Sequence, residues 1–159
     1  MRHLILCSVM WLCGLMMAVG QNVPQVIPAL QQWKSAKGKL VLPEKGKVII
    51  SPDEAKELKE GAEILVQDLK DMFGWDYRVV TGKKEKGAVC LALGKPDKTL
   101  GEEGYRMDVR SEVTIEAPTS KGVFWGTRTL LQMIHNQPEG LMKGRATDFP
   151  LYPNRGFMI

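Results

Sequence analysis

The chain has few of the residues that hold small exported domains or metal sites together. Two of its three cysteines, Cys7 and Cys13, lie within the first twenty residues, so Cys90 stands alone in the rest, as does His135. One cysteine and one histidine exclude a disulfide framework and leave no ligand set at zinc spacing. We therefore expect no metal and no organic cofactor, with Cys90 a small buried hydrophobe and His135 a residue near a helix C-terminus.

A large excess of one charge is also absent. The chain has 22 basic and 18 acidic residues, and its densest basic stretch, residues 83–86 (Lys-Lys-Glu-Lys), contains no aromatic residue. Nucleic-acid-binding surfaces usually combine a larger basic excess with aromatic side chains that stack on bases. We therefore expect no nucleic-acid partner and assign residues 83–86 to a solvated hairpin loop.

A long hydrophobic run occurs at the N-terminus. Residues 4–19 are mostly apolar, they follow the basic start Met1-Arg2-His3, and small residues precede Gln21. This pattern predicts a signal peptide over residues 1–20, cleaved near Gly20, and export to the periplasm, cell surface or extracellular space. A transmembrane anchor is the alternative. No basic stop-transfer cluster follows the run, so we expect no membrane span after cleavage.

The length after cleavage limits what the chain can contain. About 139 residues remain, enough for one sizeable core but well short of the roughly 250 residues of a (β/α)8 barrel. We assign residues 21–28, which contain two prolines and no periodicity, to a linker. Residues 29–139 then form an α/β domain, and residues 140–159 a second linker followed by one strand.

Apolar periodicity predicts two helices. Ser51 and Glu54 suggest a capping box at the start of the first helix, and Gly74 suggests its end. Spacings of three and four place on one face of this helix Ala55, Leu58, Ala62, Leu65, Leu69 and Met72. The second helix should run from Thr119 or Ser120 to about His135, and Gly126 in its interior implies a close neighbour.

Short apolar or alternating runs predict the strands. They are residues 30–33 and 39–42 as one hairpin, 47–50, 77–81, 88–93, and 105–109 with 113–117 as an antiparallel hairpin. Residues 88–93 are apolar throughout, which is typical of a central strand buried on both faces. The fold class is therefore α/β (α+β), with a mixed, largely antiparallel sheet covered by two main helices.

The sequence offers no convincing catalytic residue. Glu102-Glu103 leads into a strand and Asp53-Glu54 begins a helix, so neither pair is placed where strand ends converge on a pocket. We assign no catalytic residue. Aromatic residues such as Trp33 and Trp75 could form a sugar platform, whereas Tyr77 and Trp125 are more typical of packing.

A combination of motifs resembles a known enzyme family. It consists of Gly104-Tyr105, the strand 113–117, Gly122-x-x-x-Gly126-x-x-Thr129-Leu130-x-Gln132, Asp148-x-Pro150 and Arg155-Gly156. Together these are similar to the junction between the small N-terminal α/β domain and the catalytic barrel of family 20 glycoside hydrolases, the β-N-acetylhexosaminidases. The resemblance covers residues 29–159.

This resemblance implies a function that the chain cannot perform alone. Such enzymes remove terminal β-linked N-acetylhexosamine from glycans in carbohydrate metabolism, using the substrate's acetamido oxygen and an Asp-Glu pair of the barrel. The missing barrel of the same polypeptide would be the partner, and glycan would bind only to the full-length enzyme. Arg155 matches an arginine that donates hydrogen bonds to the terminal sugar. The alternative is a stand-alone exported carbohydrate-binding or scaffolding module.

Overall fold

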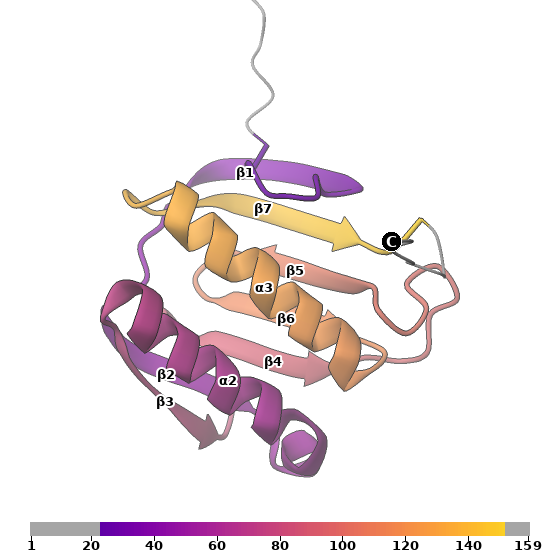
Figure 1. Ribbon diagram of the computed structural model, residues 1–159, viewed down its shortest axis with the longest axis horizontal. Helices are drawn as coiled ribbons and strands as arrows, with labels where there is room; N and C mark the ends of the chain where they lie inside the picture. The colour runs from indigo at the N-terminus through magenta and orange to yellow at the C-terminus, as the bar shows by residue number, and fades with distance from the viewer. Residues whose placement is uncertain (1–22, 152–159) are drawn as a thin grey trace, which may run out of the picture.

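Two α-helices lie side by side on one face of a seven-stranded sheet in the computed structural model, which describes residues 23–151 (Figure 1). In chain order the elements are β1 (Gln32–Leu40), β2 (Lys45–Ile50), the short 3-10 helix η2 (Pro52–Glu54), α2 (Ala55–Phe73), β3 (Asp76–Thr81), β4 (Val89–Leu93), β5 (Tyr105–Val109), β6 (Val113–Ala117), α3 (Ser120–Asn136) and β7 (Leu141–Asp148). The strand order across the sheet is β1-β7-β5-β6-β4-β2-β3.

The sheet has an antiparallel half and a parallel half. The pairs β1–β7, β7–β5 and β5–β6 are antiparallel, whereas β6–β4, β4–β2 and β2–β3 are parallel. The predicted α/β class, the mixed sheet and the two main helices are confirmed, with antiparallel pairs making up half of the sheet. The predicted hairpin of β5 and β6 is present, and β4 lies in the interior of the sheet, between β6 and β2.

Helix α2 buries most of the face predicted from its periodicity. Leu58, Ala62, Leu65 and Leu69 are buried, and Gly74 ends the helix in the left-handed region with φ 72°. Met72 is exposed, so it does not belong to this face. The capping box does not form, because Ser51 precedes η2 without a side-chain bond and α2 itself begins only after Glu54. The proline after Ser51 starts the tighter 3-10 turn instead.

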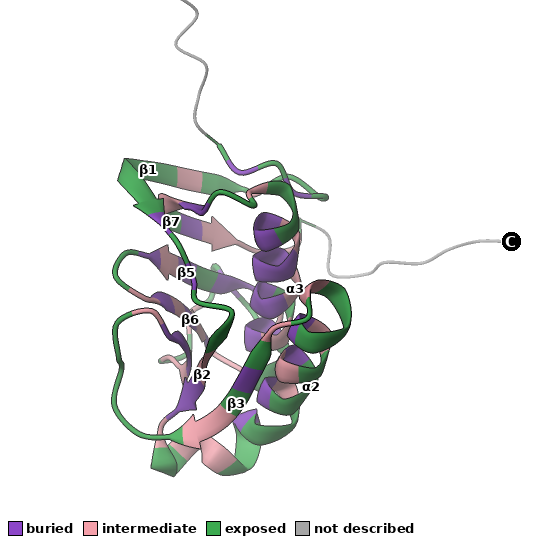
Figure 2. Ribbon diagram, turned by 90° about the vertical axis from the view of Figure 1, so that its left-hand side faces the viewer, coloured by how far each residue is buried: buried purple, intermediate pink, exposed green. Residues whose placement is uncertain are grey.

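Helix α3 begins and packs as predicted. The Thr119 hydroxyl accepts a hydrogen bond from the backbone N–H of Gly122 at 3.1 Å, which caps the first turn. Among the residues buried along its inner face are Val123, Thr127 and Leu130. The inner faces of α2 and α3 and one face of the sheet together form the main core (Figure 2).

The first strand differs from the prediction. Residues 30–42 do not form a hairpin, since residues 32–40 form one edge strand, β1, that pairs with β7. The register of β1 against β7 shifts between Ser35 and Lys39, so the residues between the two predicted hairpin strands lie in a bulge. The distant strand β7 supplies the hydrogen-bonding partner of β1. No pattern in the sequence around β1 predicts this partner.

Both predicted linkers are also corrected over their described residues. Residues 141–148 form β7, which lies between β1 and β5 as an integral strand of the sheet. The described residues of the first linker lie against α3: Gln132 Oε1 accepts from the N–H of Ile27 at 2.8 Å, and Val26 is buried. The α/β domain therefore extends further in both directions than the sequence indicated.

The sheet face away from the helices carries a small second cluster. Ile49, Ala88 and Cys90 are buried there against Val80. Residues 83–86 are exposed, as predicted, but they do not form a hairpin loop, because β3 and β4 are parallel to β2 and flank it on opposite sides. The segment joining them passes β2, and Lys47 Nζ donates to Glu85 Oε2 at 2.7 Å.

Candidate functional site

Three glycines of the motif bring α3 into direct contact with the sheet. A Cβ atom on Gly122 would lie 2.5 Å from the carbonyl oxygen of Gly104 and 2.8 Å from Cβ of Ala117. A Cβ atom on Gly104 would lie 2.9 Å from the carbonyl oxygen of Asp148. Gly126 likewise has the Ile115 and Tyr105 side chains within contact distance. The glycines therefore set the distance between α3 and strands β5 and β6.

A polar network centred on the buried Tyr105 hydroxyl lies next to this contact. The Tyr105 hydroxyl shares a hydrogen bond of 2.6 Å with Oγ1 of Thr129 on α3 and donates to Oδ2 of Asp148, at the end of β7, at 3.2 Å. Asp148 Oδ1 also accepts from the N–H of Gln31 at 3.2 Å. Burial raises the pKa of Tyr105 well above its usual range. The neutral Tyr105 hydroxyl therefore links β5, α3 and the end of β7, near the last residues that the structure describes.

The same end of the domain is hollowed. A cavity of about 360 Å³ is lined by Tyr105 and Thr129, by the α3 residues Trp125 and Gln132, and by residues 148–151. Its lining combines accessible apolar side chains, Trp125 at 39% and Leu151 at 65% exposed, with the charged residues Glu103, Arg128 and Asp148. Exposed apolar side chains therefore gather at the end of the domain where β7 ends.

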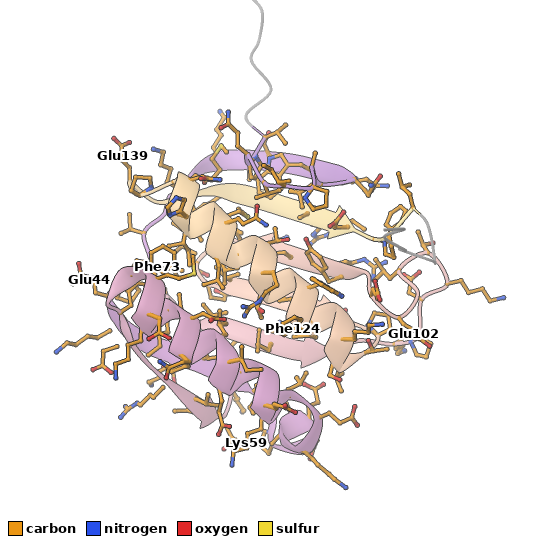
Figure 3. The ribbon with its side chains drawn as sticks, in the orientation of Figure 1. Glu44, Lys59, Phe73, Glu102, Phe124 and Glu139 are labelled. Carbon is orange, nitrogen blue, oxygen red and sulfur yellow. The ribbon has the colours of Figure 1, made fainter. Side chains whose placement is uncertain are left out.

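The outer surfaces of the two helices are linked by one arginine. The Arg128 guanidinium bonds to the Asp68 carboxylate of α2, and its Cζ lies 4.7 Å from the centre of the Phe124 ring. Phe124 also lines a shallow groove of about 250 Å³ between α2 and α3, with Ile64 at its edge. The side-chain view looks onto this helical layer and labels Phe124 on it (Figure 3).

The acidic pairs considered as catalytic residues have structural roles at helix starts. Glu103 pairs with Lys121 at 2.6 Å, and the backbone oxygen of Glu102 accepts from the Thr119 hydroxyl. Glu54 lies between η2 and α2, and Oε2 of Glu54 is buried without a hydrogen-bond partner. Glu103 lines the cavity described above, but Glu102, Asp53 and Glu54 do not, so neither pair presents two carboxylates there.

Cys90 and His135 have the environments expected from sequence. Cys90 is buried and unpaired, and burial raises the pKa of its thiol. His135 is exposed in the last turn of α3. Within residues 23–151 no group of three or more His, Cys, Asp or Glu side chains is placed to hold a metal ion, and no helix is long and apolar enough to cross a membrane. Arg155 lies outside the described residues.

Two residues of the buried network were not recognised from sequence. Thr129 was taken only as part of the helix motif, and Asp148 was assigned to a linker. The sequence contained a signal for this network, because Gly-Tyr, Thr-Leu and Asp-x-Pro all belong to the same motif. Their contact depends on a strand pairing between β5 and β7 that only the fold reveals.

Comparison with known proteins assigns this domain to a protein family. Residues 23–149 match the domain family described as Glycosyl hydrolase family 20, domain 2. The chain belongs to this family. It therefore contains the non-catalytic α/β domain of a hexosaminidase-family glycoside hydrolase, and the matched region runs from the segment before β1 to the end of β7.

Individual family 20 relatives agree with this assignment. The chain is 29% identical over 135 residues to a lacto-N-biosidase of Bifidobacterium bifidum, a match that covers 84% of this chain and 12% of that protein. A β-N-acetylhexosaminidase structure from Streptomyces coelicolor superimposes with a TM-score of 0.59 at 25% identity, covering 79% of this chain and 26% of that one. A chitobiase from Flavobacterium johnsoniae has the same fold, with a TM-score of 0.62 at 23% identity over 82% of this chain and 21% of that one.

This family 20 domain corresponds to only a part of each of these relatives. The chain spans between about an eighth and a quarter of the length of these relatives. Their names describe activities of much longer proteins. What the domain shares with the two solved structures is the fold of a helix-covered sheet.

Proposed function

We propose that this chain is the N-terminal domain of an exported β-N-acetylhexosaminidase that removes terminal β-linked N-acetylhexosamine from glycans. The observation that carries the proposal is the family 20 domain match over residues 23–149. The likeness to the β-N-acetylhexosaminidase of Streptomyces coelicolor supports the same activity class. Export rests on the signal-peptide pattern of residues 1–20, which lie outside the described residues.

The chemistry would belong to a catalytic domain that follows this one. Residues 23–149 are taken up by the α/β domain, so the 159-residue chain has no room for a barrel of roughly 250 residues. We therefore expect the isolated chain to be inactive, with no metal or organic cofactor required by the complete enzyme.

The partner of this domain would be the catalytic barrel of the same polypeptide. The helical layer and the cavity rim expose Ile64, Met72, Trp125 and Leu151. Interfaces between domains of one chain commonly bury about 600–1,500 Å², and exposed apolar side chains near the point of chain exit are suited to form part of one. The buried network at Asp148 would hold the connection between the domains in a fixed direction.

Arg155 would be the contribution of this chain to substrate binding. It comes four positions after Leu151, the last residue that the structure describes. A guanidinium group can donate two parallel hydrogen bonds to neighbouring sugar hydroxyls. This role comes from the family resemblance.

The proposal is tested by assaying two proteins on an aryl N-acetyl-β-glucosaminide. We expect no turnover by the 159-residue chain and turnover when the coding sequence that follows the Ile159 codon is included. Turnover that follows the short chain through purification would contradict its assignment as a non-catalytic domain. A natural stop codon after Ile159, with no barrel encoded downstream, would favour the stand-alone binding or scaffolding module.

A further inference from the structure

The sheet face away from the helices carries a row of charged side chains. Antiparallel register places Lys34 of β1 opposite Arg145 of β7, and Arg145 opposite Asp108 of β5. Side chains directly opposite one another in adjacent strands share a face. Tyr105 and Val109 of β5 belong to the helix-covered core, so the alternating residue Asp108 lies on the opposite face.

Asp108 holds two guanidinium groups in fixed positions. Arg145 donates to Asp108 Oδ2 from Nε at 3.1 Å and from Nη2 at 2.6 Å, and Arg110 donates to Oδ1 from Nε at 3.0 Å. The carboxylate therefore uses both oxygens. Each arginine keeps further N–H groups that are not used in these bonds.

Positive charge remains in excess around this carboxylate. A cavity of about 420 Å³ is lined by Lys34, Arg110, Lys143 and Arg145, with Asp108 as its one acidic residue, and its other lining residues are uncharged. Four cations and one carboxylate leave a net charge of +3. We call this the basic pocket. Among residues 23–151, neither the Lys34 side chain nor the Lys143 side chain has a hydrogen-bond or ion-pair partner.

The fold builds this pocket from separate segments. The bulge of β1 lies beside β7 at Lys143, since Cδ of this lysine is 4.0 Å from the position of a Cβ atom on Gly38. Arg110 comes from the turn between β5 and β6, and Lys34 from the edge strand. Side chains from three separate places in the chain thus converge on one depression. Asp108 neutralises only one of the four positive charges, so a bound anion would reduce the repulsion that remains.

We propose that the basic pocket binds an anionic saccharide, through a sulfate or carboxylate group carried by a sugar. Four cations around one carboxylate are complementary to a small anion, and the arginine N–H groups that Asp108 leaves unused can donate to its oxygens. The choice of a saccharide among anions rests on the proposed function, which places the domain in an enzyme that acts on glycans. The site lies on the side of the sheet opposite the helices, away from the apolar cavity at the end of β7.

The composition of the pocket favours a saccharide over a nucleic acid. No aromatic residue lines it, and sequence-tolerant binding of single-stranded nucleic acid depends on bases stacking on aromatic side chains. The depression is also small, whereas a nucleic-acid groove follows the backbone over several phosphates.

The proposal is tested by calorimetric titration of the 159-residue chain with four probes at fixed salt. These are a heparin octasaccharide, which carries sulfate and carboxylate, a hyaluronan oligosaccharide, which carries carboxylate only, a neutral chitin oligosaccharide and a single-stranded oligonucleotide. We expect heparin to bind and chitin not to bind. Binding of hyaluronan with equal affinity would identify the carboxylate as the recognised group, and binding of heparin alone would identify the sulfate.

Charge-reversal variants locate the site. Lys34→Glu with Lys143→Glu should weaken heparin binding about tenfold or more, since several exposed ion pairs are lost or reversed. Lys56→Glu with Lys59→Glu on α2 makes the same change of net charge away from the pocket and should weaken binding far less. Arg110→Gln provides a second variant in the pocket, and circular dichroism checks that each variant is folded.

Three results would overturn the proposal. They are no heparin binding by the unmodified chain, equal weakening by the pocket and α2 variants, and oligonucleotide binding as tight as heparin binding with the same dependence on Lys34 and Lys143. Because binding is measured on the chain alone, its failure is distinct from a failure of glycosidase activity. That activity requires the catalytic domain.

Discussion

Gly126 on α3 lies directly above Ile115 on β6. A Cβ atom on this glycine would be 2.5 Å from Cγ2 of Ile115, a branched side chain that is fully buried in the sheet. The glycine that interrupts a good helical pattern is therefore a packing requirement, as its position in the sequence suggested. Helix α3 can approach the sheet this closely only where no side chain intervenes.

Gly126→Ala should accordingly destabilise the domain. Alanine favours the helix by about 1 kcal/mol, but overpacking a tight core costs about 1–3 kcal/mol, so we expect a net loss of up to about 2 kcal/mol in the free energy of unfolding. Urea denaturation measures it. Gly61→Ala, in α2 with nothing within 4 Å of the added atom, is the matched control and should stabilise the domain instead. Equal effects of both substitutions on the free energy of unfolding would show that the Ile115 side chain moves aside for the added methyl group without cost.

Leu65→Ala tests the buried face of α2. Leu65 is 0% exposed, so truncation should cost about 2–5 kcal/mol of stability through lost burial and a residual cavity. Its neighbour Ile64 is 39% exposed, and Ile64→Ala should stay within about 0.5 kcal/mol. An unchanged urea midpoint for Leu65→Ala would mean that another face of the helix is buried.

The Tyr105–Thr129 hydrogen bond should be measurable as a coupling energy. Tyr105→Phe removes a buried hydroxyl that bonds to Thr129 and Asp148, and should cost about 1–3 kcal/mol. In a cycle with Thr129→Val, the double variant should lose about 1 kcal/mol less than the sum of the two single losses, because the shared bond is lost only once. Strict additivity would show that the two hydroxyls act independently.

Stability should fall at alkaline pH through buried tyrosine. Burial raises the pKa of Tyr77 to about 12, above the value of about 10 in an unfolded chain. A raised folded-state pKa contributes stability that is complete below pH 10 and is lost as the pH rises to about 12, in total about 2–3 kcal/mol. Between pH 8 and 12 the unfolding free energy of the original chain should fall by about 2–3 kcal/mol more than that of Tyr77→Phe, which lacks the titrating hydroxyl. Parallel curves would exclude Tyr77 as the titrating group.

Arg155 should matter only in the complete enzyme. Bonds to a charged donor contribute about 1.5–3 kcal/mol, so Arg155→Ala should lower kcat/KM about ten- to a hundredfold or more, and Arg155→Lys should recover little because the planar fork is lost. Arg78→Ala, an exposed arginine on β3, is the control and should leave kcat/KM unchanged. Equal kcat/KM values with Arg, Lys and Ala at position 155 would show that Arg155 is only a surface charge.

Several parts of the domain were predictable because their signals are local. The spacing of Leu58, Ala62 and Leu65 predicted α2, and the alternation in β5 and β6 predicted their hairpin. The motif that resembles family 20 enzymes, with its glycines in α3, led to the family that residues 23–149 match. These signals suffice because helix periodicity, strand alternation and close glycine contacts each leave a pattern in neighbouring residues.

The candidate site and the basic pocket were less predictable. Asp148 was assigned to a linker because only its position at the end of β7 brings it to Tyr105. The sequence analysis did not single out Lys34, Arg110 or Lys143, since no spacing along the chain links them. A one-dimensional pattern contains no information on which strand lies beside which.

The sequence by itself determined the helices and most strands, because each leaves a pattern in residues close along the chain, and the motif from Gly104 to Arg155 indicated the family. Only the tertiary structure decided that β1 pairs with β7, that residues 141–148 are part of the sheet, and that the segment between β3 and β4 passes β2. Pairing between distant strands is selected by the total free energy of the packed core, to which every element contributes. The same selection brings charges from separate segments into one pocket.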